Sequence, residues 1–330
     1  MSSDLEITPA VERALRAAFG TAELDSARPM GGGLSGAHVF KIRVGGVPYL
    51  LRLEAERDAF RDPARAYACM RIAADAFLAP RVRYADADDG LAIMDFIEEK
   101  SLTFDYRGSR EDLVVEAAQT VRALHAGPAF PPLVDYLDGM DALISIFRAR
   151  GLFTPKATAR VFQLYGRLRG GYRPGQGDLV ASHNDLNPRN ILFDGQRLWL
   201  VDWESAFLAD RYVDLACIAN LFAHTEEEEE LLLRTYFGEV DAAARARLFL
   251  MRQVNHLFYA VGLANSVAEA TGPVESLEGP DLAQLHMGVT LGEVDLGSAP
   301  ARLDYARARL AAAQEGMGSA RFAAALATLG

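Results

Sequence analysis

The first hundred residues alternate between one helical pattern and several strand patterns. Residues 6–19 carry apolar side chains at helical spacing and stop at Gly20, a common helix end. Two β-rich runs, 37–44 and 47–53, flank a Gly-Gly pair. Because glycine tolerates the positive φ of a tight turn, this pattern predicts a β-hairpin.

A second helix and two further strands complete this region. Asp62-Pro63 has the form of an N-cap followed by proline in the first turn, which predicts a helix that runs to about residue 77. The runs 81–84 and 91–97 are apolar and surround an Asp-Asp-Gly turn. We therefore expect an α+β lobe with four or five strands.

Beyond residue 98 the pattern becomes mainly helical, with one hairpin and no internal repeat. The expected helices cover 111–125, 137–150, 157–169 and the carboxyl-terminal stretches, and the hairpin covers 190–202. The boundary is expected at 97–101, giving an amino-terminal lobe of residues 1–97 and a helical lobe of residues 98–330, with a ligand cleft between them.

Composition and charge narrow the function classes. The 330 residues carry a formal net charge of −11, so no overall positive field favours nucleic acid as a partner. The two cysteines, Cys69 and Cys217, lie among apolar neighbours, which predicts core thiols. Neither a signal peptide nor an apolar run long enough to cross a membrane is found in the sequence, so we expect a cytoplasmic protein.

The hairpin at 190–202 places two oxygen-bearing side chains together. Asn190 enters its first strand and Asp202 leaves its second, so antiparallel pairing brings both to the same end. An amide oxygen and a carboxylate suit Mg²⁺, which keeps waters and phosphate oxygens as its other ligands. This pair predicts a magnesium site of the kind that phosphoryl transfer uses.

The segments SHNDLNPRNIL, LVDWESA and LADRYVDLACIA resemble motifs of the choline kinase and aminoglycoside phosphotransferase superfamily. The resemblance covers roughly residues 28–260 and implies a two-lobe protein-kinase-like fold. It also implies that Asp185 is the catalytic base, that Asn190 and Asp202 bind Mg²⁺, and that Asp214 supports the loop. His183 is expected to be a buried hydrogen-bonding support, and His125 to be structural.

The same resemblance implies a nucleotide site in the amino-terminal lobe. GGGLSGAHVFKIRV is similar to the hairpin that covers ATP, which makes Gly32, Gly33 and Ser35 candidate phosphate contacts. YLLRLEA places Arg52 where most kinases carry the phosphate-binding lysine, and choline kinases likewise use arginine there. A guanidinium stays charged and can bind phosphate oxygens through two nitrogens.

The helix expected from residue 63 departs from the family because it contains no glutamate to pair with Arg52. Asp62, at its start, is the nearest candidate partner. The run LAIMDFI is similar to the family's hinge strand. Met94 is then expected behind the adenine, with the backbone of Asp95 and Ile97 at its edge.

Two residues after the second hairpin strand have open roles. Glu204 is a further metal ligand, a contact for a cationic substrate, or a solvated side chain. Trp203, with Tyr236 and Tyr259, is a candidate aromatic face for a quaternary ammonium group.

The sequence therefore predicts an ATP- and Mg²⁺-dependent kinase that phosphorylates a hydroxyl of a small metabolite, with a choline- or ethanolamine-like amino alcohol as first choice. Alternatives within the family are aminoglycoside, sugar, thiamine or hydroxy amino acid kinases. An alternative of another class is a nucleotide-binding protein without catalytic activity.

Overall fold

The computed structural model describes residues 5–31, 37–175, 177–267 and 272–330. Its contacts group the chain into two compact units. The first unit combines residues 1–133 with 180–214, and the second combines 134–179 with 215–330. This grouping differs from the expected division at residue 97, because residues 180–214 pack with the amino-terminal part of the chain. The predicted lobe boundary itself stays a prediction.

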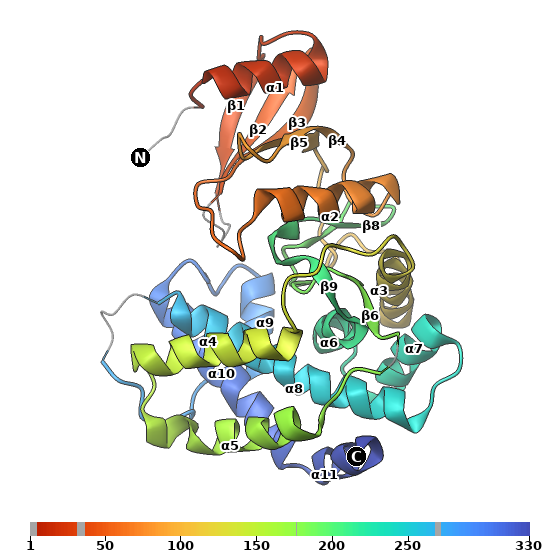
Figure 1. Ribbon diagram of the computed structural model, residues 1–330, viewed down its shortest axis with the longest axis vertical. Helices are drawn as coiled ribbons and strands as arrows, with labels where there is room; N and C mark the ends of the chain where they lie inside the picture. The colour runs from red at the N-terminus through yellow and green to blue at the C-terminus, as the bar shows by residue number, and fades with distance from the viewer. Residues whose placement is uncertain (1–4, 32–36, 176, 268–271) are drawn as a thin grey trace. The chain divides into compact units, whose positions relative to one another are not determined.

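An antiparallel sheet forms the amino-terminal part of the first unit (Figure 1). Its strands follow the order β1-β2-β3-β5-β4. They are β1 (Ser26–Met30), β2 (His38–Val44), β3 (Val47–Leu53), β4 (Val82–Asp86) and β5 (Leu91–Asp95). The Gly45-Gly46 turn closes the β2–β3 hairpin, with both glycines at positive φ. The predicted α+β sheet is confirmed, with β1 as its fifth strand.

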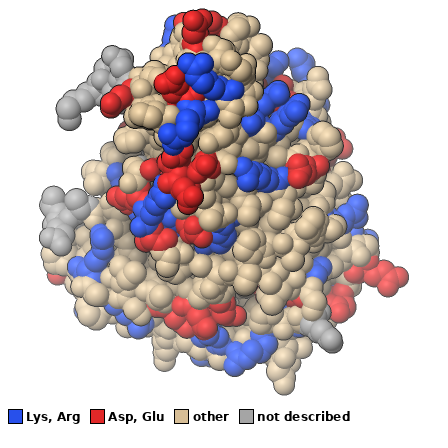
Figure 2. Space-filling view, turned by 45° about the horizontal axis from the view of Figure 1, so that its top comes forward, with Lys and Arg blue, Asp and Glu red and all other residues tan. Residues whose placement is uncertain are grey.

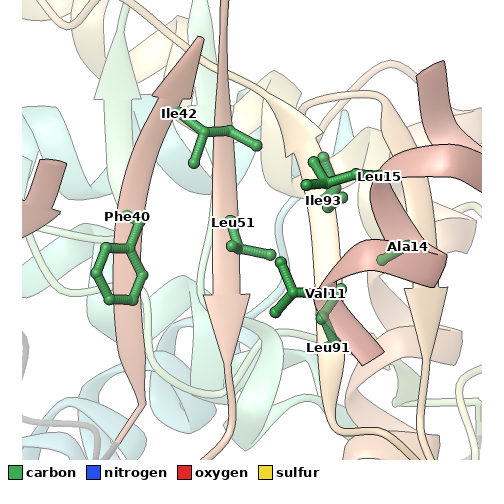
Figure 3. Packing of buried hydrophobic residues seen from close by; sticks show 8 residues of the cluster. All are labelled: Val11, Ala14, Leu15, Phe40, Ile42, Leu51, Leu91 and Ile93. Carbon is green, nitrogen blue, oxygen red and sulfur yellow. The ribbon is translucent and has the colours of Figure 1, made fainter. Parts of the chain in front are cut away.

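Helix α1 (Pro9–Phe19) covers one face of this sheet, and together they form a core. Thr8 caps its start and Gly20, at φ 77°, ends it. Figure 3 shows apolar side chains of α1 pointing toward those of β2, β3 and β5. The buried members are Val11, Ala14, Leu15, Phe40, Ile42, Leu51, Leu91 and Ile93. Each large side chain removed from water contributes roughly 1.5–3 kcal/mol.

Helix α2 (Pro63–Asp75) connects the sheet to the motif-bearing part of the first unit. Asp62 caps it by accepting a hydrogen bond from Ala64 N at 2.9 Å, as predicted. Just after the helix, the Leu78 carbonyl accepts a hydrogen bond of 2.8 Å from Leu200 N, in strand β8 (Leu198–Leu200). Figure 1 shows α2 running beside β8.

The remaining elements of the first unit surround the predicted chemistry. They are helix α3 (Arg110–His125), strands β6 (Leu179–Ser182), β7 (Ile191–Phe193) and β9 (Phe207–Asp210), a 3-10 turn at Trp203–Ser205, and the start of helix α6 (Arg211–Phe222). Strand β7 pairs with β8, and β6 with β9. Glu116 of α3 accepts a hydrogen bond from Leu198 N at 3.1 Å, which ties the β7–β8 hairpin to this helix.

The second unit is helical. Its helices include α4 (Tyr136–Arg150), α5 (Pro155–Gly171), α7 (Glu226–Phe237), α8 (Ala242–Asn265), α9 (Leu282–Thr290), α10 (Ala299–Gly318) and α11 (Ala320–Leu329). The long helix α8 packs against α4, α10 and α11, so it forms the centre of this unit. The helices expected at 137–150 and 157–169 are confirmed as α4 and α5.

Three properties of the described residues bear on the expectations from composition. Both cysteines are free and buried, as predicted. No helix in the described part of the chain is long and apolar enough to cross a membrane. On the face shown in Figure 2, groups of Lys and Arg side chains lie among groups of Asp and Glu side chains.

Candidate active site

The β7–β8 hairpin has the geometry that the sequence predicts. Ile191 pairs with Leu200, and Val201 N donates to the Asn190 carbonyl at 3.0 Å. Asn190 and the residue before Asp202 are thus joined at one end of the hairpin. The chain then turns sharply, because Asp202 adopts a left-handed backbone with φ 66°.

Asn190 also holds Asp185, five residues earlier on the loop between β6 and β7. Its side-chain Nδ2 donates to the Asp185 carbonyl at 2.8 Å and to the Asp185 Oδ2 at 3.2 Å. The other oxygen of this carboxylate accepts from Asn187 Nδ2 at 3.1 Å. Two neutral amides therefore fix the orientation of the Asp185 carboxylate. The Asn190 amide directs its nitrogen to Asp185, which leaves its oxygen for another partner.

Arg52, on β3, contacts three carboxylates of the first unit. Its Nε donates to Glu54 at 2.7 Å, its Nη1 to Asp202 at 2.9 Å, and its Nη2 to Glu204 at 3.2 Å. Its side chain is 13% exposed. Burial disfavours the charged guanidinium, but Asp202, Glu54 and Glu204 outweigh it and raise the pKa of Arg52. One cation among three carboxylates leaves a negative cluster when all are ionised.

The charged form of Glu204 is destabilised by its surroundings. Burial and the negative charge of Asp202 raise its pKa to about 7, although Arg52 opposes the shift. Glu54 and Asp185 also raise this pKa, so the Asp185 charge acts on the same cluster. The carboxylate of Glu204 is ion-paired with Arg52 and its side chain is 31% exposed, and its three expected roles stay predictions.

The expected pairing of Arg52 with Asp62, at the start of α2, is wrong. The Asp62 side chain is exposed and is used to cap the helix at Ala64 N. Glu54 takes its place from two residues further along the same chain as Arg52. The hydroxyl of Tyr67, on α2, donates to Glu54 Oε1 at 3.4 Å, so the helix contributes a neutral contact rather than a carboxylate.

Asp214, at the start of α6, organises the backbone that leads into the loop. Its Oδ2 accepts from His183 N at 2.8 Å, and its Oδ1 accepts from Asn184 N at 2.7 Å. The ring of His125 contacts the same carboxylate through Nε2 at 3.0 Å. Burial alone would raise the pKa of Asp214, but the hydrogen bond and charge of His125 outweigh it and lower this pKa. His183 is fully buried and contacts the Val201 carbonyl through Nε2 at 2.9 Å.

Trp203 does not present the aromatic face that was expected for a substrate. Its side chain is 4% exposed and lies between the rings of Phe130, at 6.0 Å, and His183, at 4.7 Å. The apolar indole next to two acids is therefore packing in the first unit. The predicted substrate contact at Trp203 is replaced by a structural role.

The predicted nucleotide residues are described in part. Gly32, Gly33 and Ser35 lie outside the described residues. Met94 is buried at the end of β5.

Asp95 is less available for adenine than expected. Its N–H donates to the Arg81 carbonyl at 2.9 Å, and its side chain is ion-paired with Arg83 at 2.6 Å. The N–H of Asp95 is thus already hydrogen-bonded. The backbone groups expected to contact the adenine edge are then the carbonyl of Asp95 and the backbone of Ile97.

The donor set fits a magnesium ion that has few protein ligands. No group of three or more His, Cys, Asp or Glu side chains among the described residues has the arrangement of a metal site. Asn190 and Asp202 supply one amide and one carboxylate, which is the small protein contribution that Mg²⁺ accepts when phosphates and waters complete its shell. The negative cluster around Arg52 provides the charge that would attract it.

Sequence reasoning missed two residues of this site. Glu54 lies two positions after Arg52, a spacing that puts both side chains on one face of a strand. Arg65 of α2 is buried and donates to the Glu204 carbonyl at 2.6 Å, which holds the 3-10 turn after Asp202. Glu54 had a signal in the sequence, whereas the partner of Arg65 is 139 residues away and had none.

Comparison of the sequence with curated proteins finds protein LicA of Haemophilus influenzae. One LicA sequence, from strain Rd, is 36% identical over 63 residues, which is 19% of this chain and 24% of LicA. Another is 23% identical over 222 residues, which is 64% of this chain and 62% of LicA. The match spans less than two thirds of the length of either relative.

Several solved structures share the kinase-like fold. A choline/ethanolamine kinase family protein from Mesorhizobium loti is 22% identical, with a TM-score of 0.67 over 97% of this chain and 98% of that chain. Choline kinase LicA from Streptococcus pneumoniae is 16% identical, with a TM-score of 0.65 over 94% and 98%. The aminoglycoside phosphotransferase APH(2″)-IIa, in a complex with streptomycin and ATP, is 17% identical, with a TM-score of 0.55 over 79% and 91%.

The sequence profile of the phosphotransferase enzyme family, APH, matches residues 26–249, well over half of the chain. This range includes Arg52, Asp185, Asn190, Asp202 and Asp214. The chain therefore belongs to the phosphotransferase enzyme family.

Proposed function

We propose that this phosphotransferase transfers the γ-phosphoryl group of ATP to a hydroxyl of a small amino alcohol, with Mg²⁺ as cofactor. The observation that carries the proposal is the arrangement within the first unit of Asp185 and Asn190, hydrogen-bonded to each other, and of Arg52, ion-paired with Asp202. Because the donor is ATP, we expect the reaction to take place in the cytoplasm.

In this proposal Asp185 orients the acceptor hydroxyl and takes its proton. The amides of Asn187 and Asn190 contact both carboxylate oxygens and so orient the base. Asp214 supports the reaction through the backbone of His183 and Asn184, which leads directly into Asp185.

Asn190 and Asp202 would hold the metal, and Arg52 would contact the phosphates of the nucleotide. A bound Mg²⁺ would offset the charge of the phosphate oxygens. Asp202 now shares one oxygen with Arg52, and binding of a cation there would free Nη1 of Arg52 for a phosphate oxygen.

The choice of an amino alcohol as acceptor rests on the similarity to the solved structures named above. The similar structures named above include proteins described as choline and ethanolamine kinases, and also an enzyme bound to streptomycin. An aminoglycoside, sugar, thiamine or hydroxy amino acid as acceptor is the alternative within the family. Since Trp203 is buried, a cationic acceptor would need other aromatic or acidic side chains.

A test of the function is Mg²⁺-dependent ADP formation with a panel of choline, ethanolamine, thiamine, sugars and aminoglycosides. We expect turnover with at least one amino alcohol. Tight ATP binding without turnover on any acceptor would contradict the proposal and favour a nucleotide-binding protein without catalytic activity.

Asp185→Asn should lower turnover by roughly 10²- to 10⁴-fold, the usual contribution of a general base, with nucleotide affinity nearly unchanged. The matched control is Asp89→Asn, which removes a half-buried carboxylate paired with the exposed Arg13 at 2.8 Å. Equal loss of nucleotide binding in Asp185→Asn would mean that Asp185 belongs to the metal site.

Asp202→Ala should show the opposite balance. We expect a large rise in the Mg²⁺ concentration needed for half-maximal nucleotide binding, measured by calorimetry, because one of two protein ligands is removed. An unchanged Mg²⁺ dependence would remove Asp202 from the metal site.

A further inference from the structure

The guanidinium of Arg52 has two edges with different partners. Along its side edge, Nε and Nη2 face Glu54, at 2.7 Å to Oε1 and 3.4 Å to Oε2. At its outer end, Nη1 contacts Asp202 at 2.9 Å and Nη2 contacts Glu204 at 3.2 Å. Glu54 therefore holds the side edge of the guanidinium, while its outer end contacts Asp202 and Glu204 of the candidate active site.

We propose that Glu54 is the positioning residue for Arg52 and replaces the acidic partner that helix α2 lacks. The inference rests on the proposed function, in which the outer end of Arg52 contacts nucleotide phosphates. Glu54 keeps the guanidinium in place when Asp202 binds a cation and the nitrogens at the outer end of Arg52 bind phosphate oxygens.

The burial of the three carboxylates supports this division of roles. The side chain of Glu54 is 13% exposed, as is that of Arg52, whereas those of Asp202 and Glu204 are 27% and 31% exposed. An ion pair that excludes water keeps its geometry better than an exposed one, because solvent screens it less. Glu54 is the partner least accessible to solvent.

The backbone of Glu54 is fixed by the sheet. Its N–H donates to the Gly90 carbonyl at 2.8 Å, which continues the β3–β5 pairing by one residue. Arg52 and Glu54 are therefore i and i+2 on one extended segment, with both side chains on the same face. The geometry of this ion pair is set within a single strand.

Helix α2 contributes little to the position of Arg52 by comparison. From this helix, Tyr67 donates a hydrogen bond to Glu54, with its hydroxyl 3.4 Å from Oε1. A hydrogen bond of that length from a neutral donor is weak beside the contact of 2.7 Å between the guanidinium and the carboxylate. The position of Arg52 should thus depend on Glu54 much more than on Tyr67.

Removal of the Glu54 charge should misplace Arg52 in a defined way. In Glu54→Gln the remaining anionic partners of Arg52 are Asp202 and Glu204. The guanidinium is therefore drawn toward these two carboxylates at its outer end. It then competes with the cation for Asp202 and presents the wrong edge to phosphate. A misplacement of about 1 Å costs on the order of 10²-fold in an aligned site.

The experiment measures Mg·ADP binding by calorimetry, which needs no knowledge of the acceptor, and ATP kinetics with the best acceptor of the panel. The variants are Glu54→Gln, Glu54→Asp, Tyr67→Phe, Arg52→Ala and the double variant Glu54→Gln/Arg52→Ala. The matched control is Glu12→Gln, which removes an exposed ion pair of 2.8 Å to Arg16. Melting temperature is measured for each protein.

We expect Glu54→Gln to weaken Mg·ADP binding and kcat/KM for ATP by roughly 10- to 100-fold, with KM for the acceptor unchanged. Tyr67→Phe and Glu12→Gln should stay within about twofold of the wild type. In the Arg52→Ala background, Glu54→Gln should have no further effect, because two residues that act through one contact are not additive. If Glu54→Gln does not fold, Glu54→Asp carries the same comparison with a shorter carboxylate.

Three results overturn the inference in different ways. Normal nucleotide affinity in Glu54→Gln, with impaired binding in Arg52→Ala, would retain the proposed function and remove Glu54 from it. Additive losses in the double variant would mean that Glu54 acts independently of Arg52. A wild-type protein that binds no nucleotide would instead overturn the proposed function, and the role of Glu54 with it.

Discussion

Replacement of Asp214 by asparagine tests how the loop that carries Asp185 is held. The carboxylate is fully buried and accepts three hydrogen bonds, from His183 N, Asn184 N and His125 Nε2, at 2.8, 2.7 and 3.0 Å. Asn184 has a left-handed backbone, with φ 65°. The conformation of this non-glycine residue is therefore maintained by its tertiary contacts.

The expected cost of Asp214→Asn follows from these contacts. Asparagine has one oxygen, so its NH₂ group must face either the N–H of Asn184 or the donors at the Oδ2 position, and the charge is lost as well. Hydrogen bonds to a charged group contribute about 1.5–3 kcal/mol each, and a buried donor left unsatisfied costs about 1–3 kcal/mol. We expect a loss of about 3–5 kcal/mol in the free energy of unfolding, the range for a broken buried ion pair.

Two measurements check this expectation. Urea unfolding at pH 7 gives the loss of stability, and amide hydrogen exchange of a peptide that spans residues 182–187 reports the loop directly. The exchange of His183 and Asn184 amides should accelerate more than that of the β2–β3 hairpin. Turnover should fall as well, because the loop that carries Asp185 loses its order.

Asp141→Asn is the matched control. Asp141 accepts from Tyr165 Oη at 2.7 Å and Arg169 Nε at 3.0 Å, but its side chain is 47% exposed. Its loss should cost about 1 kcal/mol or less. If Asp214→Asn were as stable as this control and kept its loop amides protected, the assignment of Asp214 as the support of the loop would be refuted.

Two predictions concern buried groups. Burial and the nearby charge of Arg309 lower the pKa of His256, and they lower the pKa of His286 to about 4. Between about pH 6.5 and 4 the unfolded chain therefore binds protons that the folded chain does not. Stability should fall as pH drops through this window, and His286→Gln should flatten the urea midpoint against pH; an unchanged profile would contradict this. Burial raises the pKa of the Cys69 thiol to about 12, so a thiol reagent at pH 8 should label it only after unfolding, and rapid labelling of the native protein would contradict its burial.

The elements that could be predicted from sequence are those fixed by neighbouring residues. The β7–β8 hairpin follows from two short apolar runs and a turn, and its register joins Asn190 to Val201 as expected. The cap of α2 at Asp62 is likewise local. Local patterns specify an element and its ends, because the forces that decide them act within a few residues.

The contacts that assemble the site could be predicted less well, because they join residues far apart in the chain. Arg52 meets Asp202 across 150 residues, and no periodicity encodes that meeting. Trp203 was misassigned for a related reason. An aromatic residue between two acids looks exposed in sequence, but the partners that bury it, Phe130 and His183, come from other segments of the first unit.

The partner of Arg52 lies between these two cases. In the sequence Arg-Leu-Glu, the alternation of a strand already places Arg52 and Glu54 on one face, provided that the strand continues to residue 54. The apolar pattern ends at Leu53, so the extension is supplied by the hydrogen bond from Glu54 N to the Gly90 carbonyl of the facing turn. A helix without glutamate indicates that the acid must come from elsewhere, and only the pairing of the sheet identifies Glu54 as its source.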